Sequence, residues 1–149
     1  MTKIILLVQF ASTWYLVGLC WLVQRVQYPL MNQVGVDHYR AYEQAHVTQI
    51  GPVVAPMMLI EVATAILLFA SGDAAFRRPA FLLSLVLLAV IWGSTFLLQV
   101  PMHNTLGQGF DAAAHTSLVQ TNWIRTLAWT ARGLILIAIM HSSLRGPAA

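Results

Sequence analysis

The feature that most restricts how this chain can fold is a set of apolar runs, each about as long as a membrane is thick. Three runs are nearly uninterrupted, and a fourth is apolar apart from two arginines. A helix needs about 20 residues to cross a hydrocarbon core of about 30 Å. Only 9% of the residues are charged, whereas soluble domains have roughly 25%. The sequence therefore predicts an all-α integral membrane protein, a four-helix bundle forming a single domain, 1–149, with spans at 4–23, 53–70, 80–100 and 119–140.

The distribution of basic residues predicts the orientation, because cytoplasmic segments carry an excess of Lys and Arg. The termini and the second loop hold four of these residues and the first loop holds two: Lys3, Arg77, Arg78 and Arg145 against Arg25 and Arg40. We therefore expect both termini in the cytoplasm, with the chain in a bacterial inner membrane. The first run lacks a small-residue cleavage site, so we expect it to be retained rather than removed as a signal peptide.

Charge and cysteine content narrow the possible partners. The formal net charge is +3, but no basic stripe with interleaved aromatics is present, so we expect no nucleic-acid partner. Cys20 is the only cysteine, which excludes an internal disulfide and a thiolate metal cage. The expected partners are membrane lipid and a small apolar substrate or ligand, and a homo-oligomer is an open alternative.

The first outward loop, 24–52, is too long for a simple connection, since loops of this length usually carry function. Asp37 is a suitable N-cap for a short helix in this loop, with the sequence DHYRAYEQAHVTQI. Helical spacing would place His38, Tyr42 and His46 in one stripe. Gly51 and Pro52 would then break or kink the helix where the second span begins.

The fourth span carries a polar stripe. At 100° per residue, Asn122, Arg125, Trp129 and Arg132 share one helix face. A lipid-facing arginine near the membrane centre costs about 2.5–3.5 kcal/mol on insertion scales. We therefore expect both arginines to point into the bundle and to need partners there.

Glu61 is the only acidic residue inside a predicted span, and it lies near mid-membrane. Arg132 lies at a similar depth, so the two residues are expected to pair. The pair has two open interpretations, a structural lock or a catalytic role. Arg125 lies nearer the outer face and leaves a surplus positive charge, which backbone carbonyls, the outward loops or an anionic or oxygen-rich ligand would balance.

The third span adds a matching polar face, provided that its helix continues through Pro101. The first span also carries polar residues, and two of them, Gln24 and Gln27, lie near its outer end, so that polar side chains from all four helices are expected to converge on the outer half of the bundle. This convergence predicts a cavity. The third span contributes Trp92, Thr95, Gln99 and His103, and the first contributes Gln9, Thr13, Gln24 and Gln27.

Four of the five histidines lie on the outward side of this topology. His46, His103 and His115, with Glu61 or Glu43 as an oxygen donor, form a candidate site for copper, iron or zinc. Loop histidines without a metal are the alternative. Haem is less expected, because the chain lacks C-x-x-C-H and has no two histidines at matched depth within the spans.

Three segments together resemble a known family: GPVVAPMMLIE (51–61), QVPMHNTL (99–106) and TNWIRTLAWTARG (121–133). In the order of these features the chain resembles small four-span membrane proteins classed as a domain of unknown function, which include the anthrone oxygenase-like proteins. The resemblance implies an oxygen-dependent oxidation of an aromatic or otherwise apolar substrate. It also implies that the site includes His103, Asn104, Asn122, Trp123 and Arg125.

Three classes of function are consistent with the sequence. The first is a membrane-embedded oxidoreductase or oxygenase, in which His46 and His103 bind a metal or act as acid and base. Asn104, Asn122 and Arg125 would then stabilise an oxyanion, and Glu61 would hold Arg132 or accept a proton. Gln99, Trp129 and Arg132 would contact a cofactor. The second class is a protein that binds or transports a lipid-like or quinone-like ligand, and the third is an accessory subunit of a larger membrane complex.

Overall fold

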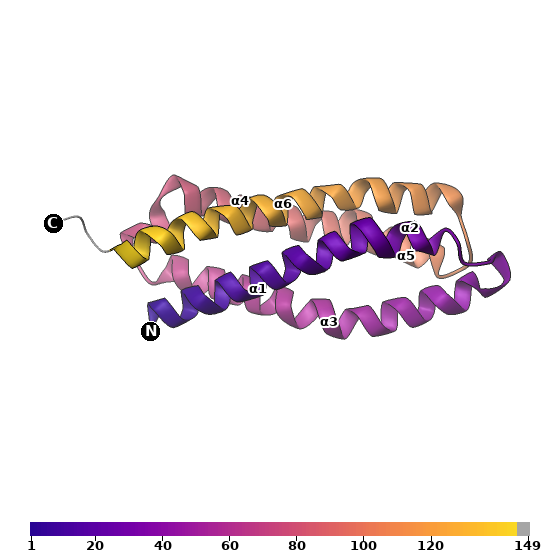
Figure 1. Ribbon diagram of the computed structural model, residues 1–149, viewed down its shortest axis with the longest axis horizontal. Helices are drawn as coiled ribbons and strands as arrows, with labels where there is room; N and C mark the ends of the chain where they lie inside the picture. Colours follow the sequence, from indigo (N-terminus) through magenta and orange to yellow (C-terminus); the bar gives the residue numbers. More distant parts are fainter. Residues whose placement is uncertain (146–149) are drawn as a thin grey trace.

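The computed structural model describes the backbone of residues 1–145 and the side chains of residues 1–142. The last four residues of the predicted domain and the Arg145 side chain of the charge count lie outside the described residues. The described chain is an all-α bundle of four long helices, each long and apolar enough to cross a membrane. The N-terminus and the C-terminal end of the described chain lie at the same end of the bundle (Figure 1).

Two of the four long helices are built from more than one element. The first consists of α1 Thr2–Leu22, the π-helical turn η1 Val23–Gln27 and α2 Tyr28–Met31. The third consists of α4 Pro79–Ser94, the π-helical turn η3 Thr95–Gln99 and α5 Val100–Leu106. The other two are α3 Val36–Ala70 and α6 Ala112–Arg145, with the short 3₁₀ helix η2 Ala74–Arg77 between α3 and α4.

The predicted short helix of the first loop is not a separate element. It is the first part of α3, a single helix of 35 residues that contains Pro52 and Pro56. A break at membrane depth would expose backbone polar groups to lipid, which explains why the chain stays helical through both prolines. Gly35, rather than Asp37, is the N-cap, and Asp37 lies in the first turn, where a negative charge is favourable.

The helices extend well past the predicted spans at the end of the bundle that holds residues 32–35 and 107–111, which is named the outward end after the predicted orientation. At 1.5 Å per residue, the 35 residues of α3 reach about 52 Å, compared with a hydrocarbon core of about 30 Å. The third helix also continues through Pro101, which lies in the first turn of α5 directly after the π-helical turn η3. The connection between the first two long helices is therefore short, residues 32–35, rather than a functional loop.

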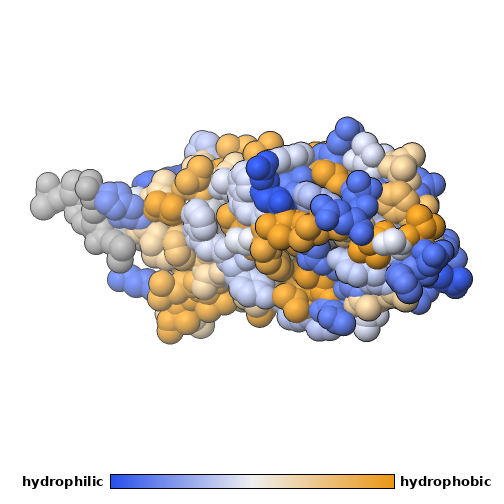
Figure 2. All heavy atoms as spheres, turned by 45° about the vertical axis from the view of Figure 1, so that its right-hand side comes forward, coloured by the Kyte–Doolittle hydropathy of each residue, from blue (hydrophilic) through white to orange (hydrophobic). Residues whose placement is uncertain are grey.

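The order of packing leaves one side of the bundle loosely closed. α1 packs against both α3 and α6, and α4 packs against α6. α3 meets the third long helix chiefly at the outward end, through α5. In Figure 2, hydrophilic residues are concentrated toward the outward end and apolar residues cover much of the rest of the visible face.

Candidate functional site

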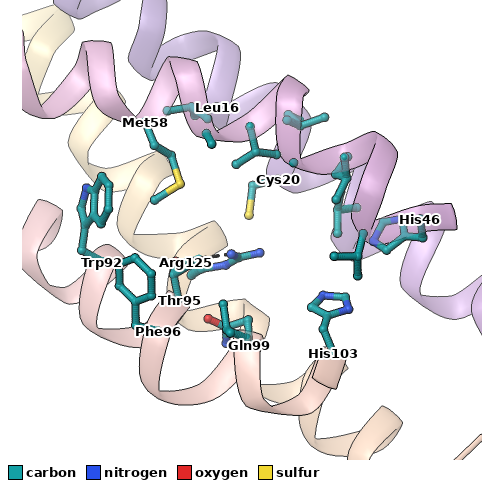
Figure 3. A pocket seen from close by; sticks show the side chains of 18 of the residues that line it. Leu16, Cys20, His46, Met58, Trp92, Thr95, Phe96, Gln99, His103 and Arg125 are labelled. Atoms are coloured by element: carbon teal, nitrogen blue, oxygen red, sulfur yellow. Dashed lines mark hydrogen bonds between the residues drawn. The ribbon is translucent and has the colours of Figure 1, made fainter. Parts of the chain in front are cut away.

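A cavity of about 470 Å³ lies between the four long helices, in the outward half of the bundle. Small-molecule sites in proteins range from roughly 300 to 1,000 Å³, so the volume suits a small organic ligand. Most of the wall is apolar, including Leu16, Met58, Trp92 and Phe96. A few polar side chains interrupt it, as Figure 3 shows for His46, Thr95, Gln99, His103 and Arg125.

Arg125 projects from α6 into this cavity (Figure 3). Its Nε donates to Asn122 Oδ1 at 2.8 Å, and its Nη1 donates to Thr95 Oγ1 at 3.4 Å. The guanidinium lies 5.8 Å from the centre of the Trp129 ring. Among the described residues no carboxylate lies within ion-pair distance of Arg125. The cavity therefore contains a positive charge that is hydrogen-bonded but not neutralised.

The outward end of the cavity holds a histidine paired with a carboxylate. His103 Nδ1 lies 2.5 Å from Glu43 Oε1, and Glu43 is fully buried. An ionised carboxylate only accepts hydrogen bonds, so Nδ1 carries the proton and Nε2 is left as the basic nitrogen. Nε2 lies 3.1 Å from the hydroxyl of Tyr28, which also lines the cavity. The three residues form a line of groups that can pass a proton.

The structure brings together two of the three histidines of the predicted metal site, His46 and His103, and leaves His115 apart. The rings of His46 and His103 lie 5.5 Å apart, and His46 Nδ1 is 2.6 Å from Gln27 Nε2. His115 Nε2 instead donates to the backbone carbonyl of Tyr28 at 2.8 Å. Within the described chain, no group of three His, Cys, Asp or Glu side chains is arranged to hold a metal ion.

Glu61 and Arg132 form the predicted pair, but they lie outside the cavity lining. Arg132 Nε donates to Glu61 Oε1 at 2.9 Å, and both side chains are fully buried. Thr13 Oγ1 and Trp129 Nε1 also donate to Glu61, at 2.6 and 3.0 Å. Arg132 Nη1 donates to Ser84 Oγ at 3.0 Å and to the Ser84 carbonyl oxygen. Because these contacts occupy both carboxylate oxygens, the geometry suits a structural lock.

The remaining predicted site residues fall in different environments. Gln99 lines the cavity, accepts from Ser94 and donates to Thr121. Asn104 lies at the exposed rim of the cavity. Asn122 is buried behind it and positions Arg125, while Trp123 packs edge-on against Trp21, 5.5 Å between ring centres.

Sequence reasoning named Glu43 only as an alternative oxygen donor for a metal and missed its direct pairing with His103. The predicted stripe contained His38, which is exposed, whereas the buried stripe of α3 contains Tyr39, Glu43 and His46. Spacings of four and three residues place these side chains on one helix face. The sequence allows either stripe at helical spacing, the one that begins at His38 or the one that begins at Tyr39. Only packing against the other helices decides which of the two is buried.

Fold and site together define a class: a transmembrane four-helix bundle with a ligand-sized cavity that contains an unpaired arginine and a histidine–carboxylate pair. Comparison of the chain with protein-family models, with curated proteins and with solved structures gave no match.

Proposed function

We propose that this protein is a membrane-embedded oxidoreductase that uses dioxygen to oxidise a small aromatic or otherwise apolar substrate in the cavity. The observation that carries the proposal is the Arg125 guanidinium, which faces an apolar cavity without a carboxylate partner among the described residues. A fixed positive charge in a site that excludes water stabilises a developing oxyanion more strongly than it would in bulk water. The resemblance to anthrone oxygenase-like proteins suggests the same class of chemistry.

The proton-transfer groups lie on the outward side of the same cavity, with Tyr28 next to Arg125. A methylene conjugated with a carbonyl through an aromatic ring, as in anthrone, loses a proton to Tyr28 as Tyr28 passes its own proton to His103 Nε2. Glu43 stabilises the resulting imidazolium at Nδ1. The electron pair of the broken C–H bond moves to the substrate oxygen, and Arg125 stabilises the enolate.

The enolate is the reductant of dioxygen in this scheme. Its carbon forms a bond to one oxygen atom, giving a peroxide that then loses water. The balance is R₂CH₂ + O₂ → R₂C=O + H₂O, so the methylene is oxidised to a carbonyl and one oxygen atom leaves in water.

Turnover of anthrone by protein reconstituted in lipid nanodiscs tests the proposal. We expect Arg125→Ala and His103→Ala to lower the rate by about 10²- to 10³-fold, the usual effect of removing an oxyanion donor or a general base. Oxygen uptake and product absorbance give the rate. The matched controls are Arg25→Ala and His38→Ala, because both side chains are exposed and outside the cavity lining.

Unchanged turnover in both cavity variants would refute the oxidoreductase. Elemental analysis and an optical spectrum of the same preparation identify any copper, iron or haem.

Non-catalytic binding of a lipid-like or quinone-like ligand is the second candidate, and the largely apolar cavity wall favours it. Arg125 would then recognise the ligand's oxygen without chemistry. Binding that depends on Arg125 in a preparation without turnover would support this alternative.

A further inference from the structure

The cavity is weakly closed on one side. Its other sides are formed by helices in direct contact, α3 with α1, α1 with α6 and α6 with α4. Between α3 and the third long helix, the residues that line the cavity are also exposed on the bundle surface. These residues, here named the side opening, are Val47, Ala55, Leu59, Phe96 and Val100.

All five residues of the side opening are apolar, and their exposed fractions reach 58% for Leu59 and Phe96. Among the described residues, the one exposed polar residue that lines the cavity is Asn104, which lies in α5, beyond the side opening toward the outward end. An aqueous entrance to a charged cavity would be expected to carry polar side chains at its rim. Exposing apolar side chains to lipid at this position carries no free-energy penalty, because the hydrocarbon tails of lipids are as apolar as these side chains. The composition of the rim therefore matches a path from the lipid rather than from water.

Helix irregularities lie on both sides of the side opening. Pro52 and Pro56 interrupt the hydrogen bonds of α3 beside Ala55. On the opposite side, the π-helical turn η3 contains Phe96. Prolines and π-helical turns are the usual causes of helix kinks, and π-helical turns occur frequently at functional sites. Two independent irregularities thus flank the same opening.

The polar groups lie behind this opening. Figure 3 shows Arg125 reaching from α6 into the space between α3 and η3. Gln99 and His103 line the same cavity from the third long helix. A ligand entering from the lipid with its oxygen-bearing head first would meet Arg125. A long apolar substituent would then remain among the residues of the side opening, in contact with lipid.

We infer that the cavity opens sideways into the bilayer and selects substrates that carry an apolar chain. The oxygen-bearing aromatic head lies against Arg125, and the chain leaves between α3 and η3. This inference rests on the proposed function and names its substrate class: chain-bearing aromatic ketones, enols or quinones that are dissolved in the membrane.

Two benzoquinones that differ only in a decyl chain on the ring test this inference, since they resemble the oxidised product. Binding in nanodiscs is followed by quenching of tryptophan fluorescence, because Trp92 and Trp129 line the cavity. We expect Ala55→Phe to weaken binding of the decyl quinone about tenfold while changing the chainless quinone less than about twofold. Ala63→Phe is the matched control, because Ala63 is exposed on the same helix but does not line the cavity.

The comparison between variants separates chain recognition from simple partition into lipid, because partition is the same for every variant. If Ala55→Phe weakens the binding of both quinones equally, or of neither, the inference that the chain leaves through the side opening is overturned. Arg125→Ala should weaken both quinones, which tests the head-group site separately. If the wild type binds neither quinone, this inference is overturned, whereas persistent anthrone turnover would leave the proposed oxidoreductase standing.

Discussion

At the scale of single residues, Arg125 and Arg132 of α6 lie in opposite electrostatic situations. Arg132 is fully buried against Glu61 and Ser84. Arg125 has hydrogen-bond partners but no carboxylate within ion-pair distance among the described residues. Although they lie only seven residues apart on one helix, the two residues are suited to different roles: Arg132 stabilises the fold, and Arg125 is placed to bind a ligand.

Replacing Glu61 tests whether the Glu61–Arg132 pair stabilises the fold. Glu61→Ala leaves the buried Arg132 charge without its counter-ion, and breaking a buried pair in this way costs about 3–5 kcal/mol. We expect a lower unfolding temperature and a lower yield of folded protein, measured by thermal unfolding in detergent.

The double variant Glu61→Leu with Arg132→Met is the control, since replacing both charges by apolar groups often restores stability. Wild-type thermal stability in Glu61→Ala alone would contradict the ion-pair assignment.

Depth along the helices was enough to predict the Glu61–Arg132 pair from the sequence, because one acid and one base lie near mid-membrane. The Glu43–His103 pair was not predictable in the same way. It joins helices across the outward end, and the rotation of α3 that turns Glu43 inward and His38 outward depends on packing against neighbours.

At the scale of the elements, proline was a poor guide to where helices end. Gly51 and Pro52 predicted a break, yet α3 continues past them, and α5 likewise contains Pro101. Proline removes one hydrogen bond, whereas ending the helix within lipid would leave several backbone groups unsatisfied. The existence of four spans was therefore predictable, while their full lengths were not.

The contact between α1 and α6 depends on a small residue. A Cβ atom at Gly133 would lie 3.2 Å from two carbons of the Trp14 ring. We expect Gly133→Leu to force the two helices apart and to lower the free energy of unfolding by about 1–3 kcal/mol, the usual cost of overpacking. Denaturant or thermal unfolding in the same detergent measures the difference.

Gly18→Leu on α1 is the matched control, because Gly18 is exposed and nothing lies within 4 Å of its Cβ position. A loss of stability as large as that of Gly133→Leu would show that the effect comes from glycine replacement in general.

At the scale of the whole molecule, four long helices in alternating directions place both termini and residues 71–78 at one end (Figure 1). Residues 32–35 and 107–111 lie at the other end. The distribution of Lys and Arg predicts that the end with the termini faces the cytoplasm. The Glu43–His103 pair would then lie toward the outer face.

Cysteine labelling of intact cells tests this orientation. We expect Gln108→Cys to react with a membrane-impermeant maleimide and Ala74→Cys to react only after the cells are opened, since both positions are exposed. The native Cys20 is buried and gives little background. The reverse labelling pattern would place the termini outside.

The unneutralised charge of Arg125 also has an evolutionary consequence. Holding a cation in an apolar cavity opposes folding, so selection for stability alone would favour an apolar side chain at this position. In a lineage that no longer used the ligand, Arg125 would be free to drift, whereas Arg132 could change only together with Glu61. The two arginines would therefore diverge at different rates among descendants of this chain, and their separate histories would record whether the cavity was still in use.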